Sequence, residues 1–244
     1  MRALSLILSL CAYTAVAQLL VDVEGSYIFS VPYNTVRIPA QGGTQFDLAH
    51  DLKLNQKSLF VFRARASYTI AQRHVISLLA APLTIKSSGS FDNDVTYSGF
   101  TYKRNTPVEA RYMFNSYRLT YRYLLLAHDK ITFGLGITGK VRHADIALKS
   151  SEGSSNYPDL GFVPLINLYL RYDPTKHWAF LLEGDGLASR QGRAADFFGG
   201  VAYKFTEDFA IKAGYRVLEG GADVTRNYNF SWINYASVGV WVGF

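Results

Sequence analysis

The stretch ASVGVWVGF, residues 236–244, alternates between two kinds of side chain. One side of an extended chain here is apolar and ends on an aromatic residue: Val238, Val240, Val242 and Phe244. The opposite side carries mostly small residues: Ser237, Gly239, Trp241 and Gly243. Alternation with a period of two predicts a β-strand that has one apolar face. The same pattern recurs along most of the chain, so it decides the fold.

Four further stretches alternate in the same way: VDVEGSYIF (21–29), LFVFRARASYTI (59–70), FNSYRLTYRYLL (114–125) and ITFGLGITGKVR (131–142). Ten strands fit the whole pattern, at roughly 19–30, 57–70, 74–86, 108–126, 130–147, 159–172, 177–189, 194–206, 209–221 and 229–244. Pro82 and Pro164 fall inside two of them, and because proline lacks a ladder donor we expect a bulge or a strand end at each.

The connections between these strands are of two lengths. Short ones cover 71–73, 127–130, 173–176 and 206–208, and longer ones cover 31–56, 87–107, 148–158 and 221–228. Short turns at one end and long loops at the other are the layout of outer-membrane barrels. The sequence therefore predicts an all-β fold, a transmembrane antiparallel up-and-down β-barrel of about ten strands, with 8–12 possible.

The first 17 residues have the features of an export signal. Arg2 gives the positive start, the apolar core follows in residues 4–12, and Ala15 and Ala17 are the small residues that precede a cleavage site. We expect a cleaved signal peptide at 1–17 and a barrel domain at 18–244. Cys11 is the only cysteine of the chain and lies within this signal, so the exported domain would hold no thiol or disulfide.

Composition favours the same class. Charged residues make up 18% of the chain, against about 25% in soluble domains, and aromatic residues make up 15%. Removing residues 1–17 takes away only Arg2 from the charged residues, so the net charge falls from +6 to +5. These positive charges are interleaved along the strands and do not form a patch, so we expect no nucleic-acid partner.

Aromatic residues indicate which face of the barrel is outside. Nine of them lie on the apolar face near a short turn or at residue 244, where they predict a ring at a membrane interface: Tyr68, Tyr121, Tyr123, Tyr172, Trp178, Tyr203, Phe205, Phe209 and Phe244. The opposite face carries charges, which we expect to line the lumen: Arg63, Arg65, Arg118, Arg122, Arg142, Glu183, Asp185, Asp196, Lys212 and Arg216, beside Asp22 and Glu24.

The alternating C-terminal strand and its final Phe244 resemble the last strand of Gram-negative outer-membrane barrel proteins of the small-barrel type. The resemblance implies location in the outer membrane, contact with membrane lipid and lipopolysaccharide, and recognition of this strand by the barrel-assembly machinery. Asp92 and Asp94, with His143 and Asp145 at the loop end of a strand, are similar to the omptin proteases, which set two aspartates against a histidine–aspartate couple. Here the histidine precedes the aspartate, on the fifth strand.

A ten-strand barrel has a narrow lumen, since about eight strands are just filled by their own side chains. The sequence predicts an integral outer-membrane barrel that is structural or a narrow, porin-like passive channel for small solutes. The alternative is a barrel-borne enzyme with its site at the extracellular rim, either an omptin-like protease or a lipid-modifying hydrolase. A secreted soluble barrel that binds an apolar ligand stays open as a third reading. We expect no cofactor and no metal site, because no two histidines lie at i, i+2 or i, i+4.

Overall fold

The computed structural model describes residues 18–54 and 59–244; the predicted signal peptide and Cys11 lie outside these ranges. The barrel wall is built from β1 (Gln18–Arg37), β3 (Leu59–Ile70), β4 (His74–Ala81) with β5 (Thr84–Ser90), β8 (Pro107–His128), β9 (Ile131–Lys149), β10 (Ser154–Tyr172), β11 (Trp178–Ser189), β12 (Gly192–Lys204), β13 (Phe209–Val224) and β14 (Asn227–Gly243). Three short strands lie outside this series: β2 (Phe46–Asp47), β6 (Val95–Tyr97) and β7 (Phe100–Tyr102).

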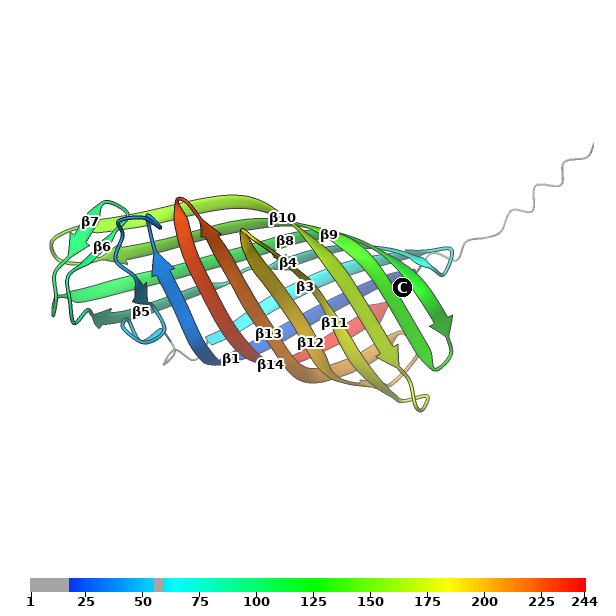
Figure 1. Cartoon of the computed structure of the whole chain (residues 1–244). Coiled ribbons are helices and arrows are strands. Elements are labelled where there is room, and N and C mark those ends of the chain that lie inside the picture. Colours follow the sequence, from blue (N-terminus) through cyan, green and yellow to red (C-terminus); the bar gives the residue numbers. More distant parts are fainter. Residues whose placement is uncertain (1–17, 55–58) are drawn as a thin grey trace, which may run out of the picture.

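The wall closes on itself with every strand antiparallel to its neighbours (Figure 1). β14 pairs with β1 from Leu20↔Gly243 to Arg37↔Tyr228, with two register shifts along the way. β4 and β5 occupy one position in the wall, since both pair with β8. The predicted all-β, ten-strand up-and-down barrel is therefore confirmed. In the described part of the chain, no helix is long and apolar enough to cross a membrane.

The apolar face of the strands is outside and the polar face is inside. Tyr121 and Val240 are 42% and 37% exposed, whereas Arg118 is 4% exposed and points into the lumen. The prediction of an apolar exterior and a charged interior is confirmed, and this excludes the soluble barrel with an apolar core. A strand can serve both faces because successive side chains point to opposite sides of the sheet.

Both prolines mark changes in pairing, in different ways. At Pro82 the predicted interruption is present, because β4 ends at Ala81 and β5 begins at Thr84. Between them, the Leu83 N–H donates to Asn115 Oδ1 at 3.1 Å. At Pro164 the predicted strand end is wrong, because β10 runs through it. Its pairing with β11 nevertheless stops at Ile166, so within 18–54 and 59–244 the strand partner of residues 154–165 is β9 alone.

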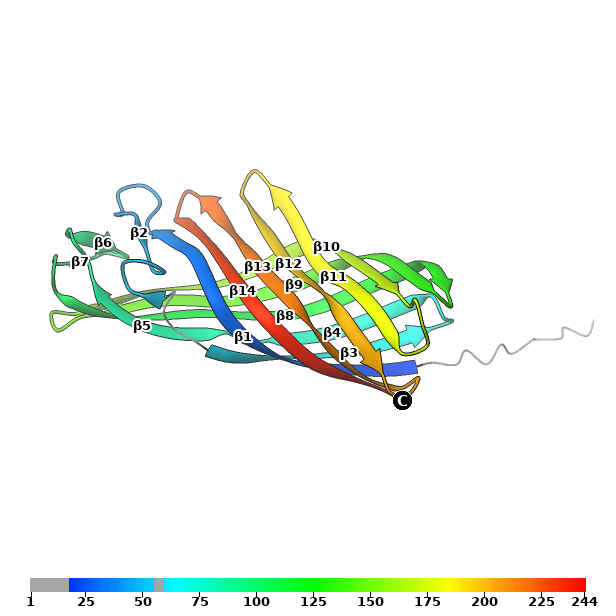
Figure 2. The same cartoon turned by 90° about the horizontal axis from the view of Figure 1, so that it is seen from below.

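The wall has unequal heights. β8, β9 and β10 continue well beyond the ends of β11 to β14 (Figure 1, Figure 2). The long loop predicted at 148–158 is wrong for this reason, since its residues form a hairpin with a turn near 150–153. The loop predicted at 221–228 is likewise mostly strand, and β1 extends to Arg37. These stretches are polar on their outward side, which hid their alternation.

The raised strands β5, β8, β9 and β10 form a small sheet, and residues 38–54 and 91–106 fold onto its inner side. We call these elements together the head. β2 pairs with the upper part of β1, and the β6–β7 hairpin is held by hydrogen bonds from Tyr97 and Tyr102 to the carbonyls of Ile146 and Leu148. Backbone contact is close at Gly89, where a Cβ atom would lie 2.4 Å from the Asp51 carbonyl oxygen.

Candidate functional site

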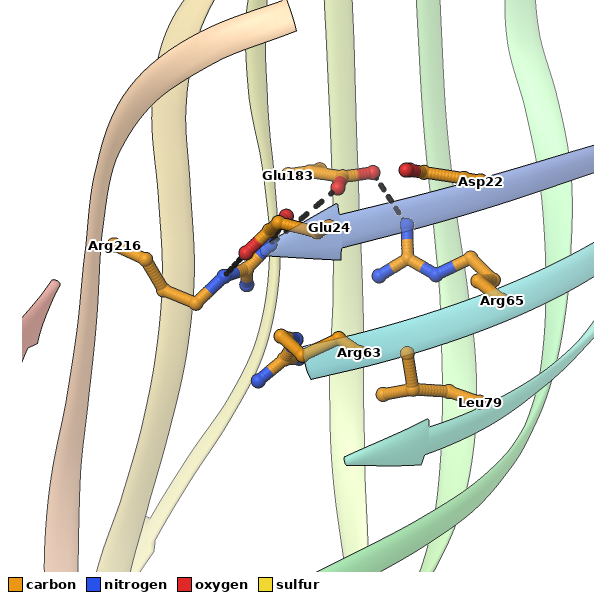
Figure 3. Close-up of a pocket in the computed structure, with 7 residues that line it drawn as sticks. All are labelled: Asp22, Glu24, Arg63, Arg65, Leu79, Glu183 and Arg216. Carbon is orange, nitrogen blue, oxygen red and sulfur yellow. Dashed lines mark hydrogen bonds and ion pairs between the residues drawn. The ribbon is translucent and has the colours of Figure 1, made fainter. Parts of the chain in front are cut away.

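The middle of the lumen holds a network of ion pairs that crosses the barrel. Arg216 on β13 is its centre: Nε and Nη2 donate to the two carboxylate oxygens of Glu24 on β1 at 2.6 and 2.7 Å, and Nη1 donates to Asp196 on β12 at 2.8 Å. Figure 3 shows Arg216, Arg63 and Arg65 gathered around Glu24 and Glu183. These ion pairs link side chains of different strands through the inside of the barrel.

Further pairs extend the network to the other side of the lumen. Arg118 on β8 donates to Asp185 at 2.7 Å and to Asp196 at 2.5 Å, and Arg63 also reaches Asp196 at 3.0 Å. Arg65 pairs with Glu183 at 2.5 Å. All of these side chains are largely buried, so each charge depends on its partner and not on water.

The remaining cations of the lumen that were named from the sequence are Lys212, Arg122 and Arg142. Lys212 pairs with Asp22 at 2.6 Å and with Glu24 at 3.2 Å. Arg122 donates through Nε to Asn167 Oδ1 at 2.7 Å and lies over the ring of Tyr169. Arg142 pairs with Asp159 on β10, away from the central group.

Above this network, toward the head, the lumen is closed by an apolar core. Leu48, Leu52 and Leu54 from residues 38–54 are completely buried against inward side chains of the wall such as Ile85 and Leu148. Aromatic residues from both long connections meet there, with Phe46 in contact with Phe91 and Tyr97. Burial raises the pKa of the Tyr97 hydroxyl, which donates to a backbone carbonyl.

A second apolar cluster closes the short-turn end, where the turns at 71–73 and 205–208 and residue 244 lie. Trp241 points inward from β14 and packs with Phe198, Leu181 and three alanines, with Leu20 against them. Two cavities within the lumen provide about 10 and 20 Å³ for the centre of a water molecule. Spaces of this size hold one or two waters each.

The predicted ring of aromatics lies on the outer surface. All nine residues are between 36% and 73% exposed. Trp178, Tyr203, Phe205 and Phe209 form a chain of ring contacts with centroids 5.0–5.4 Å apart across β11, β12 and β13. A second group of exposed outward aromatics was not singled out from the sequence: Phe29, Phe60, Tyr117, Phe162 and Trp232. The sequence feature that could have identified this group is that each member lies roughly ten residues or more from the short-turn end of its strand.

The four candidate catalytic residues are not brought together into one site, and Asp94 and Asp145 have separate partners. Asp94 is exposed in the head, and hydrogen bonds from Lys103 and the Arg104 N–H hold the pKa of its carboxyl below the usual range. Asp145 is buried and pairs with Arg111 at 2.5 Å, while His143 lies exposed on the outer face of β9. Within the described ranges, no hydrogen bond or ion pair joins Asp92 or Asp94 to His143 or Asp145.

Two lumen residues escaped the sequence-based assignment of the site. Asn167 binds Arg122 and also donates to Asp185 Oδ1 at 2.8 Å, but it lies in an apolar run whose alternation is obscured by Val163 and Leu165. Lys140 shares the strand face of Thr138 and Arg142, which was the signal that could have found it. Among the described residues, no group of three or more histidine, cysteine or acidic side chains could hold a metal ion.

The chain thus forms a closed antiparallel barrel with an apolar exterior, aromatic residues at its outer edges and ion pairs inside. The fold is that of a bacterial outer-membrane β-barrel protein. No protein-family model matches the chain, and neither does any curated protein.

Solved structures match this fold at low identity. Ail, the attachment invasion locus protein of Yersinia pestis, is 8% identical with a TM-score of 0.40, and the match covers 93% of this chain and 99% of Ail. The outer membrane protease OmpT from Escherichia coli is 10% identical with a TM-score of 0.47, covering 93% of this chain and 96% of OmpT. Neisserial surface protein A is 15% identical with a TM-score of 0.33, covering 93% and 97%. These likenesses concern the fold alone.

Proposed function

We propose that the protein is an integral outer-membrane barrel with a structural role, which anchors the head at the cell surface and conducts no solute. The observation that carries this proposal is the filled lumen. Apolar clusters occupy both ends, and buried ion pairs span the middle. The narrow passive channel expected from strand count alone would need a continuous passage, and the side chains inside the barrel argue against one.

The outer surface supports the membrane location. Phe162 and Tyr172 on β10, and Trp232 and Phe244 at β14, are exposed aromatics at opposite edges of the apolar band. About 10 and 12 residues separate these pairs, which is roughly 23–28 Å after a tilt of about 45°. That height matches the apolar band of about 25 Å in outer-membrane barrels. Contact with outer-membrane lipid and lipopolysaccharide, and recognition of β14 by the assembly machinery, belong to the same proposal.

Two of the irregular segments also fit this placement. Backbone groups without ladder partners are not tolerated against lipid, because no water satisfies them there. The interruption at Pro82 and the chain from 48 to 54 lie at the head side of the upper aromatics. The head therefore stands in the aqueous phase, and with the four short turns and the end of β14 at the opposite side, that side faces the periplasm.

Ion flux through the purified, refolded protein tests the proposal. A folded barrel migrates differently in detergent gels before and after heating, which shows that the sample under test is folded. We expect such samples to give no conductance steps in planar bilayers at high salt. Reproducible steps of defined size from the folded wild-type protein would overturn the proposal and restore the channel.

A further inference from the structure

The smaller of the two cavities lies within the ion network of the lumen. It provides about 10 Å³ for the centre of a water molecule, which is close to the space of one such molecule. The described residues that line it are charged, apart from Leu79 of β4 (Figure 3): Asp22 and Glu24 from β1, Arg63 and Arg65 from β3, Glu183 from β11 and Arg216 from β13. This lining sets three carboxylates beside three guanidinium groups, so its formal charges balance.

Two carboxylate oxygens at this cavity lack a hydrogen-bond donor. Oδ1 of Asp22 and Oε1 of Glu183 are buried, and in the described part of the chain neither accepts a hydrogen bond. The other oxygen of each carboxylate is occupied, by Lys212 Nζ at 2.6 Å on Asp22 and by Arg65 at 2.5 Å on Glu183. Lys212 and Arg216 lie 3.6 and 3.8 Å from Glu183 Oε1, which is too far for a hydrogen bond. A buried acceptor without a donor is costly.

The same cavity also has hydrogen-bond donors in its lining. Arg63 and Arg65 both line it, and each guanidinium carries five N–H groups. Toward residues of 18–54 and 59–244, Arg63 donates one hydrogen bond, to Asp196, and Arg65 donates one, to Glu183. The cavity therefore brings two unpartnered acceptors and further N–H donors to a space for one small molecule.

We propose that this cavity binds one water molecule, which donates to Asp22 Oδ1 and Glu183 Oε1. The same molecule accepts from a guanidinium N–H of Arg63 or Arg65, and buried waters make about three such bonds. A cation would be repelled by the guanidinium groups of the lining, and an anion by the two unpartnered oxygens, whereas water serves both. The bound water joins β1, β3 and β11 inside the barrel. This site goes beyond the structural role proposed above and does not depend on whether the barrel conducts ions.

High-resolution crystals of the folded protein, soaked in rubidium bromide, test the site. Rubidium and bromide both scatter anomalously, so an ion of either sign reveals itself. We expect a peak about 2.8 Å from Asp22 Oδ1 and from Glu183 Oε1, without anomalous signal at either absorption edge. An anomalous peak of rubidium or of bromide at this position would assign an ion and overturn the proposal. Direct contact between the two carboxyl groups, with no density between them, would overturn it as well, since they would then share a proton.

Filling the cavity gives a second readout. Leu79 is 8% exposed, and Leu79→Phe should take up the space of the water, remove its peak and lower the unfolding midpoint in urea, because two buried oxygens then lose their donor. Leu83→Phe is the matched control, since Leu83 is 4% exposed and lines the second, mostly apolar cavity of about 20 Å³, and its midpoint should fall less. Equal falls in the two variants would overturn the proposal. If Leu79→Phe does not fold, the wild-type peak decides.

Discussion

Replacing Arg216 with methionine tests whether the ion network stabilises the barrel. Methionine keeps much of the volume but removes three charge-assisted hydrogen bonds, at 2.6, 2.7 and 2.8 Å, in a fully buried site. Removing one partner of a buried ion pair costs about 3–5 kcal/mol. Glu24 retains Lys212 at 3.2 Å and Asp196 retains Arg63 at 3.0 Å, which places the expected loss near the lower limit. A loss of about 3 kcal/mol lowers the folding equilibrium constant more than 100-fold.

Arg193→Met is the matched control. Arg193 also binds a carboxylate through two oxygens, at 2.9 and 3.1 Å from Nε to Glu219, but its side chain is 51% exposed. An exposed pair of this kind contributes about 0–1 kcal/mol. The free energy of unfolding is measured by urea titration in detergent micelles or vesicles, with tryptophan fluorescence and heat-modifiable gel mobility as probes.

Two outcomes would show whether burial governs the contribution of these ion pairs to stability. If Arg216→Met and Arg193→Met lose equal stability, burial does not govern the value of these pairs and the reasoning fails. If the large loss arises from carboxylates that lose their main partner, adding Glu24→Gln to Arg216→Met should recover part of it, because one buried and only partly compensated charge is then removed.

Ile137 is 69% exposed on the outer face of β9, so Ile137→Arg should cost about 2–4 kcal/mol on folding into vesicles, against about 0–1 for Val224→Arg at the far edge of β13. Equal losses at both positions would contradict a lipid-facing band. Gly89→Ala should push residues 47–54 away from β5, since the new Cβ would lie 2.4 Å from the Asp51 carbonyl oxygen, and the loosened segment should be cleaved faster by trypsin at Lys53. Gly199→Ala, which meets no atom within 4 Å, is its control and should leave digestion unchanged. Ser151→Cys at the head and Thr175→Cys at a short turn should react differently with a membrane-impermeant maleimide, the first on intact cells and the second only after permeabilisation. Labelling of both on intact cells would argue against the proposed orientation.

The strands could be predicted from the sequence because one face of each is apolar and the other is polar, which gives a period of two. The inside and outside of the barrel followed from the same pattern once the aromatics near the short turns were placed at an interface. The prediction failed where that contrast disappears. Residues 148–158 are polar on their outward side because they stand in water, so a long hairpin was mistaken for a loop.

The interior of the head and the ion pairs could not be predicted in the same way. Leu48, Leu52 and Leu54 look like apolar residues in a loop, and their burial depends on the raised strands that arrive later in the chain. Arg65 and Glu183 are 118 positions apart, and the curvature of the wall brings them together. The sequence placed both in the lumen, but which cation meets which carboxylate depends on the stagger between strands.

The upper part of β10 has an unpaired edge. Among the described residues, 157–165 have no strand partner on the side away from β9, so their backbone groups on that side are available to an extra strand from another molecule. Such an edge is a template for self-association when it is long and regular. Pro158 and Pro164 occupy it, and neither can donate a backbone hydrogen bond. The two prolines thus remove two backbone donors from this open edge, and replacing them should make pairing with an added strand more favourable.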